Sequence, residues 1–191
     1  MPMENMLIAR ICHDLITPFN AINLGLEAFE MSSDMSLMEN IKSSVNKANS
    51  VLKFNRELFS EKADTFCYSV NSIKQIVSDI LKSSNILFDL ESDIDNLPSI
   101  AGKIIMYTAV IAKEIMPFGG TVTTKVHDMS GEITTRCHGK SIAVPSMPIK
   151  GELTYRNVIR YSLLELLERA GFELTIQHEG ADIIISEKMI I

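Results

Sequence analysis

The stretch ARICHDLITPFNAINLGLE, residues 9–27, has the pattern of an amphipathic helix with a proline inside it. Apolar side chains recur along one seam at three- and four-residue spacing, with Leu26 beside them: Ile8, Ile11, Leu15, Pro18, Ile22 and Phe29. A proline inside a helix removes one hydrogen bond and crowds the carbonyl four residues back, at a cost of about 3 kcal/mol. Here that carbonyl belongs to Asp14, next to His13. The sequence therefore predicts a kink at Pro18, close to a single histidine.

A second helix follows a short break, SSDMS at residues 32–36. Its apolar positions have the same helical spacing: Ile41, Val45, Ala48, Leu52 and Phe59. Two long helices joined by a short loop form an antiparallel hairpin. Such a hairpin, residues 1–62, cannot enclose its own apolar stripes. We therefore expect two chains to pair as a homodimer with a four-helix bundle.

The remainder of the chain, residues 63–191, has a different pattern. Strands are predicted at 65–70 and 86–91, around a helix at 71–82. A second helix is expected at 100–116, where Pro117 and Gly119–Gly120 end it. The other predicted elements are a β-hairpin over 121–137 that turns at 128–131, a loop with Pro145 and Pro148, a helix over 153–170, and a closing hairpin from 172. This half is therefore α+β, with helices on one face of a mostly antiparallel sheet.

Composition excludes several classes of partner and predicts a compartment. The net charge is −6 and no Lys/Arg cluster stands out, which argues against nucleic acid. The longest apolar run, 104–112, is too short to span a membrane. The three cysteines have no C-x-x-C spacing, which indicates free thiols in a reducing compartment, and we expect a cytoplasmic protein.

His13 is the residue most suited to chemistry. It falls at the outermost position of the helix, so packing does not explain it, and an exposed imidazole is a usable nucleophile at neutral pH. Neighbours three, four and seven residues away share its face, namely Arg10, Thr17 and Asn20. The adjacent Cys12 is expected to be buried.

The segment His13–Pro18, H-D-L-x-x-P, resembles the phosphoacceptor motif of the dimerisation domain of two-component histidine kinases. The flanking ARIC and NAINLGLE, and later EIMPFGGTVT, are more specifically similar to the ChpT-type histidine phosphotransferases of alphaproteobacteria. The resemblance spans nearly the whole chain. It implies a dimeric four-helix bundle followed by an α/β sandwich that resembles a degenerate histidine-kinase ATPase domain.

The resemblance also implies a role for each residue around His13. His13 would accept a phosphoryl group from the receiver-domain aspartate of a hybrid histidine kinase and pass it to the receiver of a response regulator. Asp14 would orient the ring. Arg10, Thr17 and Asn20 would form the surface on which the receiver docks, since the bend at Pro18 opens the helix there. The receiver would bring its own Mg²⁺, so no cofactor is expected on this chain.

The nucleotide site of a kinase is not recognisable. The Asn-rich box should lie before Gly119–Gly120, but residues 99–120 contain no Asn, and the D-x-G-x-G motif is absent. A P-loop ending at Gly139-Lys140-Ser141 would need a glycine at 134, where the residue is threonine. We therefore expect no ATP binding.

Other sites have weaker support. Cys137 and the histidines at 127, 138 and 178 fit no zinc spacing, so no metal site is predicted. Two alternatives to a phosphotransferase stay open at this point. One is a fragment of an ATP-dependent sensor histidine kinase, and the other is a non-catalytic dimeric module that binds receivers.

Overall fold

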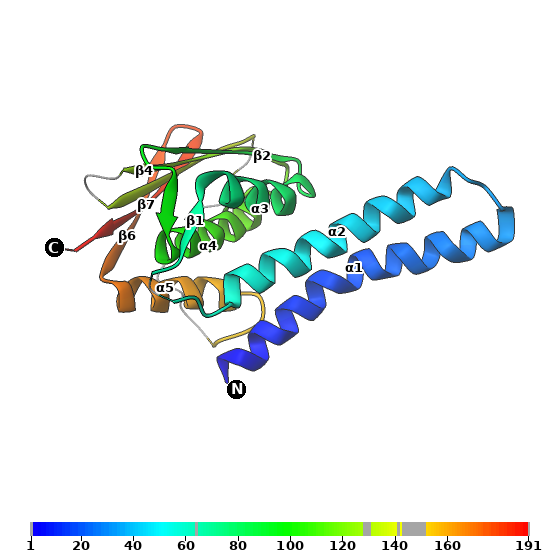
Figure 1. The fold of residues 1–191 in the computed structure, drawn as a ribbon. Helices are drawn as coiled ribbons and strands as arrows, with labels where there is room; N and C mark the ends of the chain where they lie inside the picture. The colour runs from blue at the N-terminus through cyan, green and yellow to red at the C-terminus, as the bar shows by residue number, and fades with distance from the viewer. Residues whose placement is uncertain (1, 64, 128–130, 141, 143–151, 191) are drawn as a thin grey trace.

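The computed structural model describes residues 2–190, apart from 64, 128–130, 141 and 143–151. The chain begins with the helical hairpin, formed by α1 (Met3–Ser32) and α2 (Leu37–Phe59). The break between the two helices is held by local polar bonds, since the Asp34 carboxylate accepts from the Ser36 amide at 2.9 Å. Figure 1 shows the hairpin extending away from the rest of the molecule, with its turn at the far end. The predicted pair of antiparallel helices is confirmed.

The rest of the chain is α+β, as predicted. Its helices are α3 (Val70–Lys82), α4 (Ser99–Ile115) and α5 (Val158–Ala170). A five-stranded sheet has the order β2-β4-β5-β7-β6 and contains β2 (Ile86–Ser92), β4 (Gly120–His127), β5 (Glu132–His138), β6 (Phe172–Glu179) and β7 (Asp182–Met189). Among the described strands of this sheet, β2 and β4 form the one parallel pair. The sheet is therefore mixed, with a mostly antiparallel ladder.

Two short strands form a separate sheet, in which β1 (Cys67–Ser69) pairs with β3 (Asn96–Pro98). The sequence predicted a longer strand at 65–70. The structure ends it early because Ser69 caps α3, with its side chain accepting from the Ser72 amide at 3.2 Å. Since the pair is antiparallel, α3 and α4 start at opposite ends of it. The Val70 amide donates to the Asp95 carbonyl at 2.9 Å, and the Ser99 amide donates to the Phe66 carbonyl at 3.0 Å.

Helix α5 begins five residues later than predicted. Residues 152–157 lie ahead of it, and the Asn157 side chain accepts from the Thr154 amide at 2.8 Å. An asparagine that bonds to nearby backbone in this way offers the chain an alternative to helix. Residues 128–130 of the turn predicted at 128–131 lie outside the described residues, as does the loop with Pro145 and Pro148.

The core lies between the sheet and the helices, and α4 is almost entirely buried. The strands alternate buried and exposed side chains, as a sheet with one solvated face does. The C-terminal half of α2 packs into this core through Val51, Phe54 and Leu58. The hairpin is thus packed onto the α+β half at its open end, near α5 (Figure 1). Among the described residues, no helix combines the length and hydropathy that a membrane span requires.

The change of direction between α4 and β4 depends on Gly119. Its φ of +77° lies in the left-handed region, and a Cβ there would come within 2.5 Å of the Asn85 carbonyl oxygen. Only glycine fits this conformation without strain. The same close approach lets the Gly120 amide donate to Asn85 at 3.2 Å, which sets β4 beside β2.

Candidate functional site

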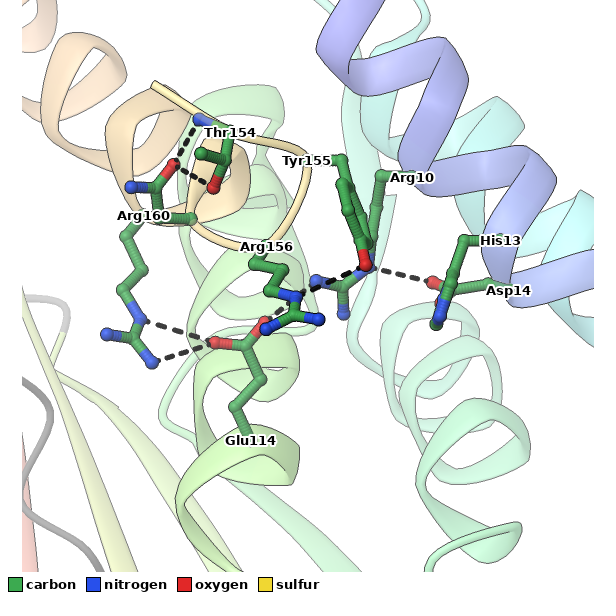
Figure 2. A network of polar contacts seen from close by, with 9 residues as sticks. Arg10, His13, Asp14, Glu114, Thr154, Tyr155, Arg156 and Arg160 are labelled. Carbon is green, nitrogen blue, oxygen red and sulfur yellow. Dashed lines mark hydrogen bonds and ion pairs between the residues drawn. The ribbon is translucent and has the colours of Figure 1, made fainter. Parts of the chain in front are cut away.

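His13 lies on α1 with its ring turned toward the α+β half (Figure 2). Its side chain is 62% exposed. Nδ1 lies 3.3 Å from Oδ1 of Asp14, and the ring stacks obliquely against Tyr155, with centroids 5.3 Å apart. The second ring nitrogen, Nε2, has no hydrogen bond to any described residue. The histidine is therefore held by one nitrogen and open at the other.

Asp14 is the first member of a network of ion pairs that joins three helices (Figure 2). Arg10 Nε donates to Asp14 Oδ2 at 3.1 Å, and Arg10 Nη1 donates to Glu114 Oε1 at 3.0 Å. Arg160 on α5 donates to the other oxygen of Glu114 through Nε and Nη2, at 3.2 and 3.1 Å. We call these four residues the ion bridge. It connects α1 to α4 and α5.

The two central residues of the ion bridge are largely shielded from solvent. The side chains of Arg10 and Glu114 are 16% and 17% exposed. Burial by itself would lower the pKa of Arg10, but the carboxylates of Asp14 and Glu114 outweigh it, and the pKa is raised. Arg10 is therefore a fixed cation, and its two bonds orient Asp14 relative to the second half of the chain.

A cavity of about 260 Å³ opens beside His13, between the hairpin and the α+β half. Apolar groups of the core line it, together with charged and polar groups from α1, α2, α4 and the turn after α3. The lining residues are Arg10, His13, Asp14, Thr17, Pro18, Lys47, Val51, Phe54, Asn55, Leu58, Ile80, Ser83, Ser84, Val110, Lys113 and Ile159. Burial lowers the pKa of Lys113, while the nearby Asp14 carboxylate acts in the opposite direction. Three cations and one carboxylate line the cavity, so its field is positive.

The structure brings only some of the predicted site residues together. His13, Asp14 and Arg10 are joined by the contacts above, but Arg10 is largely buried and engaged by two carboxylates. Thr17 and Asn20 are exposed on the same side of α1. Thr17 lines the cavity, and Asn20 lies beyond it.

Pro18 lies inside α1, which continues through it as a helix. All residues of α1 are described, and Pro18 is the one that is buried. It therefore packs at the floor of the cavity, where the missing amide leaves the Asp14 carbonyl without its usual helical donor. Cys12 was predicted to be buried and is exposed instead, because it lies on the outer face of α1.

Sequence reasoning missed Glu114, Arg160, Tyr155, Lys47 and Lys113. All five come from elements far from His13 along the chain, and no local pattern marks them. The absence of Asn from 99–120 is visible in the sequence, but no sequence pattern indicates that Glu114 lies opposite Arg10. Within the described part of the chain, no group of three or more His, Cys, Asp or Glu side chains could hold a metal ion.

Comparison with known proteins is consistent with this arrangement. A family model described as the histidine phosphotransferase C-terminal domain matches residues 70–182. The protein phosphotransferase ChpT of Brucella abortus (strain 2308) is 26% identical over 95% of this chain and 92% of its own length. A solved bacterial phosphotransferase superposes with a TM-score of 0.84 at 26% identity, over 97% of this chain and 95% of that one.

A histidine kinase, AdeS of Acinetobacter baumannii, shares the fold at lower similarity. Its TM-score is 0.52 at 12% identity, over 93% of this chain and 96% of that one. The α+β half thus has the kinase-like architecture that the sequence predicted. With a family model that covers more than half of its residues, the chain belongs to the histidine phosphotransferase family.

Proposed function

We propose that this chain serves a phosphorelay by carrying a phosphoryl group on His13. The group would come from the receiver-domain aspartate of a hybrid histidine kinase and pass to the receiver of a response regulator. The observation that carries the proposal is the geometry of His13, whose ring is held at Nδ1 by Asp14 while Nε2 is open beside a positive cavity. The similarity to a protein phosphotransferase, ChpT, supports it. Its test is labelling of His13 by a phosphorylated receiver, described in the Discussion.

The chemistry follows from the ring contacts. With its proton on Nδ1, facing Asp14, the imidazole presents the lone pair of Nε2 to phosphorus. The Nε2–P bond forms as the bond between phosphorus and the aspartyl oxygen breaks, and the electron pair stays on the receiver's carboxylate. No proton leaves, so the ring becomes positively charged. Asp14 stabilises that charge, as the carboxylate of a catalytic triad does, and the same steps in reverse phosphorylate the next receiver.

The receiver is proposed to dock over the exposed side of α1. Thr17 and Asn20 are small, exposed and close to His13, so a helix of the receiver can approach there. Arg10 faces the same region but is bound to two carboxylates, so its contribution is to position Asp14. Phosphoryl transfer depends mainly on in-line placement and charge stabilisation. The receiver would supply the Mg²⁺, which leaves the phosphotransferase without a cofactor of its own.

We further propose that the chain has no ATP-dependent kinase activity, although its α+β half has the kinase-like fold. The segment where Asn side chains should hold Mg²⁺ and phosphates is instead the buried α4. At its end, Glu114 is engaged by Arg10 and Arg160. Both oxygens of Glu114 accept from these arginines, so this carboxylate is not free to hold Mg²⁺.

Isothermal calorimetry with Mg·ATP is therefore expected to show no binding at micromolar concentrations. Incubation of the chain alone with γ-labelled ATP is expected to leave it unlabelled. An active sensor kinase, carried through the same assay, verifies the reagents. Micromolar affinity or self-labelling would instead favour the kinase fragment.

The hairpin is proposed to pair with that of a second copy. On α1, Ile8, Cys12, Phe19 and Leu26 are spaced by four, seven and seven residues and are all exposed. On α2, Val45 and Leu52 are 40% and 47% exposed, seven residues apart. Such spacing puts the residues on one helix face. The face is apolar and uncovered in the single chain, which supports a four-helix bundle built from two hairpins.

Phe19→Glu is expected to convert the dimer to a monomer. Burial of each large apolar side chain contributes about 1.5–3 kcal/mol, and the variant would also bury a charge in each copy. Light scattering after size exclusion, at micromolar concentration, measures the mass. Leu24→Glu is the matched control, since Leu24 is 65% exposed but lies off this face. A monomeric wild type, or a dimeric Phe19→Glu variant, would contradict the proposed bundle.

A further inference from the structure

Two lysines from different helices line the cavity beside His13. Lys47 comes from α2 and Lys113 from α4. Lys113 is within electrostatic range of two carboxylates and two cations, namely Asp14, Glu114, Lys47 and Arg10. Among the described residues it has neither a hydrogen bond nor an ion pair. It is thus a half-buried ammonium without a direct counter-charge.

Other lysines in a comparable environment are paired. Lys103 is also half-buried with a pKa lowered by burial, and its Nζ donates to the Ser60 carbonyl at 2.7 Å. Lys62 is paired with Glu57 at 3.1 Å. Burial of an unpaired ammonium is costly, so such a group normally has a partner. The unpaired state of Lys113 therefore indicates an anion that occupies the cavity at some stage.

The charge balance of the cavity fits a dianion. Within the ion bridge, Arg10 and Arg160 balance Asp14 and Glu114, so the ammonium groups of Lys47 and Lys113 remain uncompensated. A phosphoryl group carries about −1.5 to −2 at neutral pH. The volume of about 260 Å³ is several times the roughly 30 Å³ that one water occupies in the liquid, so a phosphoryl group has room there.

We propose that this cavity is a phosphoryl-binding site in which Lys113, together with Lys47, holds the phosphate oxygens of a phosphoryl group on His13 or of free phosphate. The proposal rests on the function proposed above, in which His13 is the acceptor. Preorganised cations next to a transferring group stabilise the charge that develops there. The lysines take no part in bond making, and their contribution is electrostatic.

The experiment uses phosphoramidate, a small phosphoryl donor that avoids any effect on receiver docking. Lys113→Met and Lys47→Met remove one charge each while keeping most of the side-chain volume. Each is expected to slow labelling of His13 by about tenfold or more. Lys113→Arg, which keeps the charge, is expected to restore most of the rate. Lys42→Met is the matched control on α2, because Lys42 is exposed and outside the cavity.

A second arm tests free phosphate. Titration of inorganic phosphate, followed through the NMR signals of the His13 ring, is expected to shift these signals in the wild type and much less in Lys113→Met. Slower labelling of the lysine variants identifies the phosphoryl group on His13 as a ligand of the cavity. Loss of the phosphate-induced shifts in Lys113→Met identifies free phosphate as a ligand. Wild-type behaviour of both lysine variants in both arms would overturn the inference. Labelling that persists in His13→Gln would instead overturn the proposed acceptor, so the two failures are distinguishable.

Discussion

His13→Gln is expected to abolish phosphoryl transfer from a phosphorylated receiver to the chain. Glutamine can hydrogen-bond like one side of the ring, but its amide nitrogen is not a nucleophile, so no phosphoryl bond can form. The fold should be unaffected, because the His13 side chain is 62% exposed and its described contacts are with Asp14 and Tyr155. The measurement is transfer of radiolabel between purified proteins, with circular dichroism and light scattering to verify folding and mass.

The matched control replaces the other three histidines together, His127, His138 and His178. All three are exposed, and only His138 has a described ion pair, with Asp182 at 2.6 Å. Transfer by this triple variant is expected to stay within about twofold of the wild type. Thr17→Arg and Asn20→Arg should both slow transfer from the receiver, because they obstruct docking. Asn20→Arg should leave labelling by phosphoramidate unchanged, since Asn20 lies outside the cavity that Thr17 lines. A labelled His13→Gln protein would mean that another residue is the acceptor.

Glu187→Gln is expected to stabilise the protein at alkaline pH. Glu187 is fully buried on β7, where Thr108 Oγ1 donates to Oε1 at 2.7 Å and Oε2 has no described partner. Burial raises the pKa of this carboxyl to about 8, against the lowering effect of the Thr108 hydrogen bond. Near neutral pH the folded protein therefore keeps it protonated, whereas the unfolded chain has ionised it.

The sign of the pH effect follows from proton linkage. The folded state binds the proton more tightly, so the stability due to Glu187 is complete below its unfolded pKa and is lost as pH rises to about 8. Each pKa unit corresponds to about 1.4 kcal/mol, so the loss amounts to several kcal/mol. Glutamine is neutral at every pH, so the Glu187→Gln variant does not lose this part of the stability as the pH rises. Urea unfolding at about pH 5, 7 and 9 measures the slope. Glu173→Gln, at an exposed site on β6, is the control, and parallel slopes for wild type and Glu187→Gln would contradict the assignment.

Much of the fold could be predicted because its signals are local. SSDMS separates α1 from α2, and the Gly119–Gly120 pair follows the end of α4, as their turn chemistry indicates. Periodicity also placed His13 on an exposed face of α1. The start of α5 was predicted too early, because the pattern could not show that the Asn157 side chain bonds back to Thr154. Local sequence is informative where local bonds decide the structure.

The site could be predicted only in part, because its other half comes from distant segments. Arg10 was expected to face a partner, yet its guanidinium is engaged by Glu114, which is separated from it by more than a hundred residues. The same holds for the lysines of the cavity, which meet only when α2 packs beside α4. Periodicity along one helix reports which face a residue occupies. It cannot report which other element covers that face.

The ion bridge has a consequence for the order of events in the relay. Since Glu114 ties α1 to α4 and α5 through Arg10 and Arg160, the wall beside His13 stays in place whichever receiver arrives. If both receivers dock over α1 as proposed, they meet one and the same surface and must occupy it in turn. The relative abundance and phosphorylation of the two receivers then decide the net flow, by mass action.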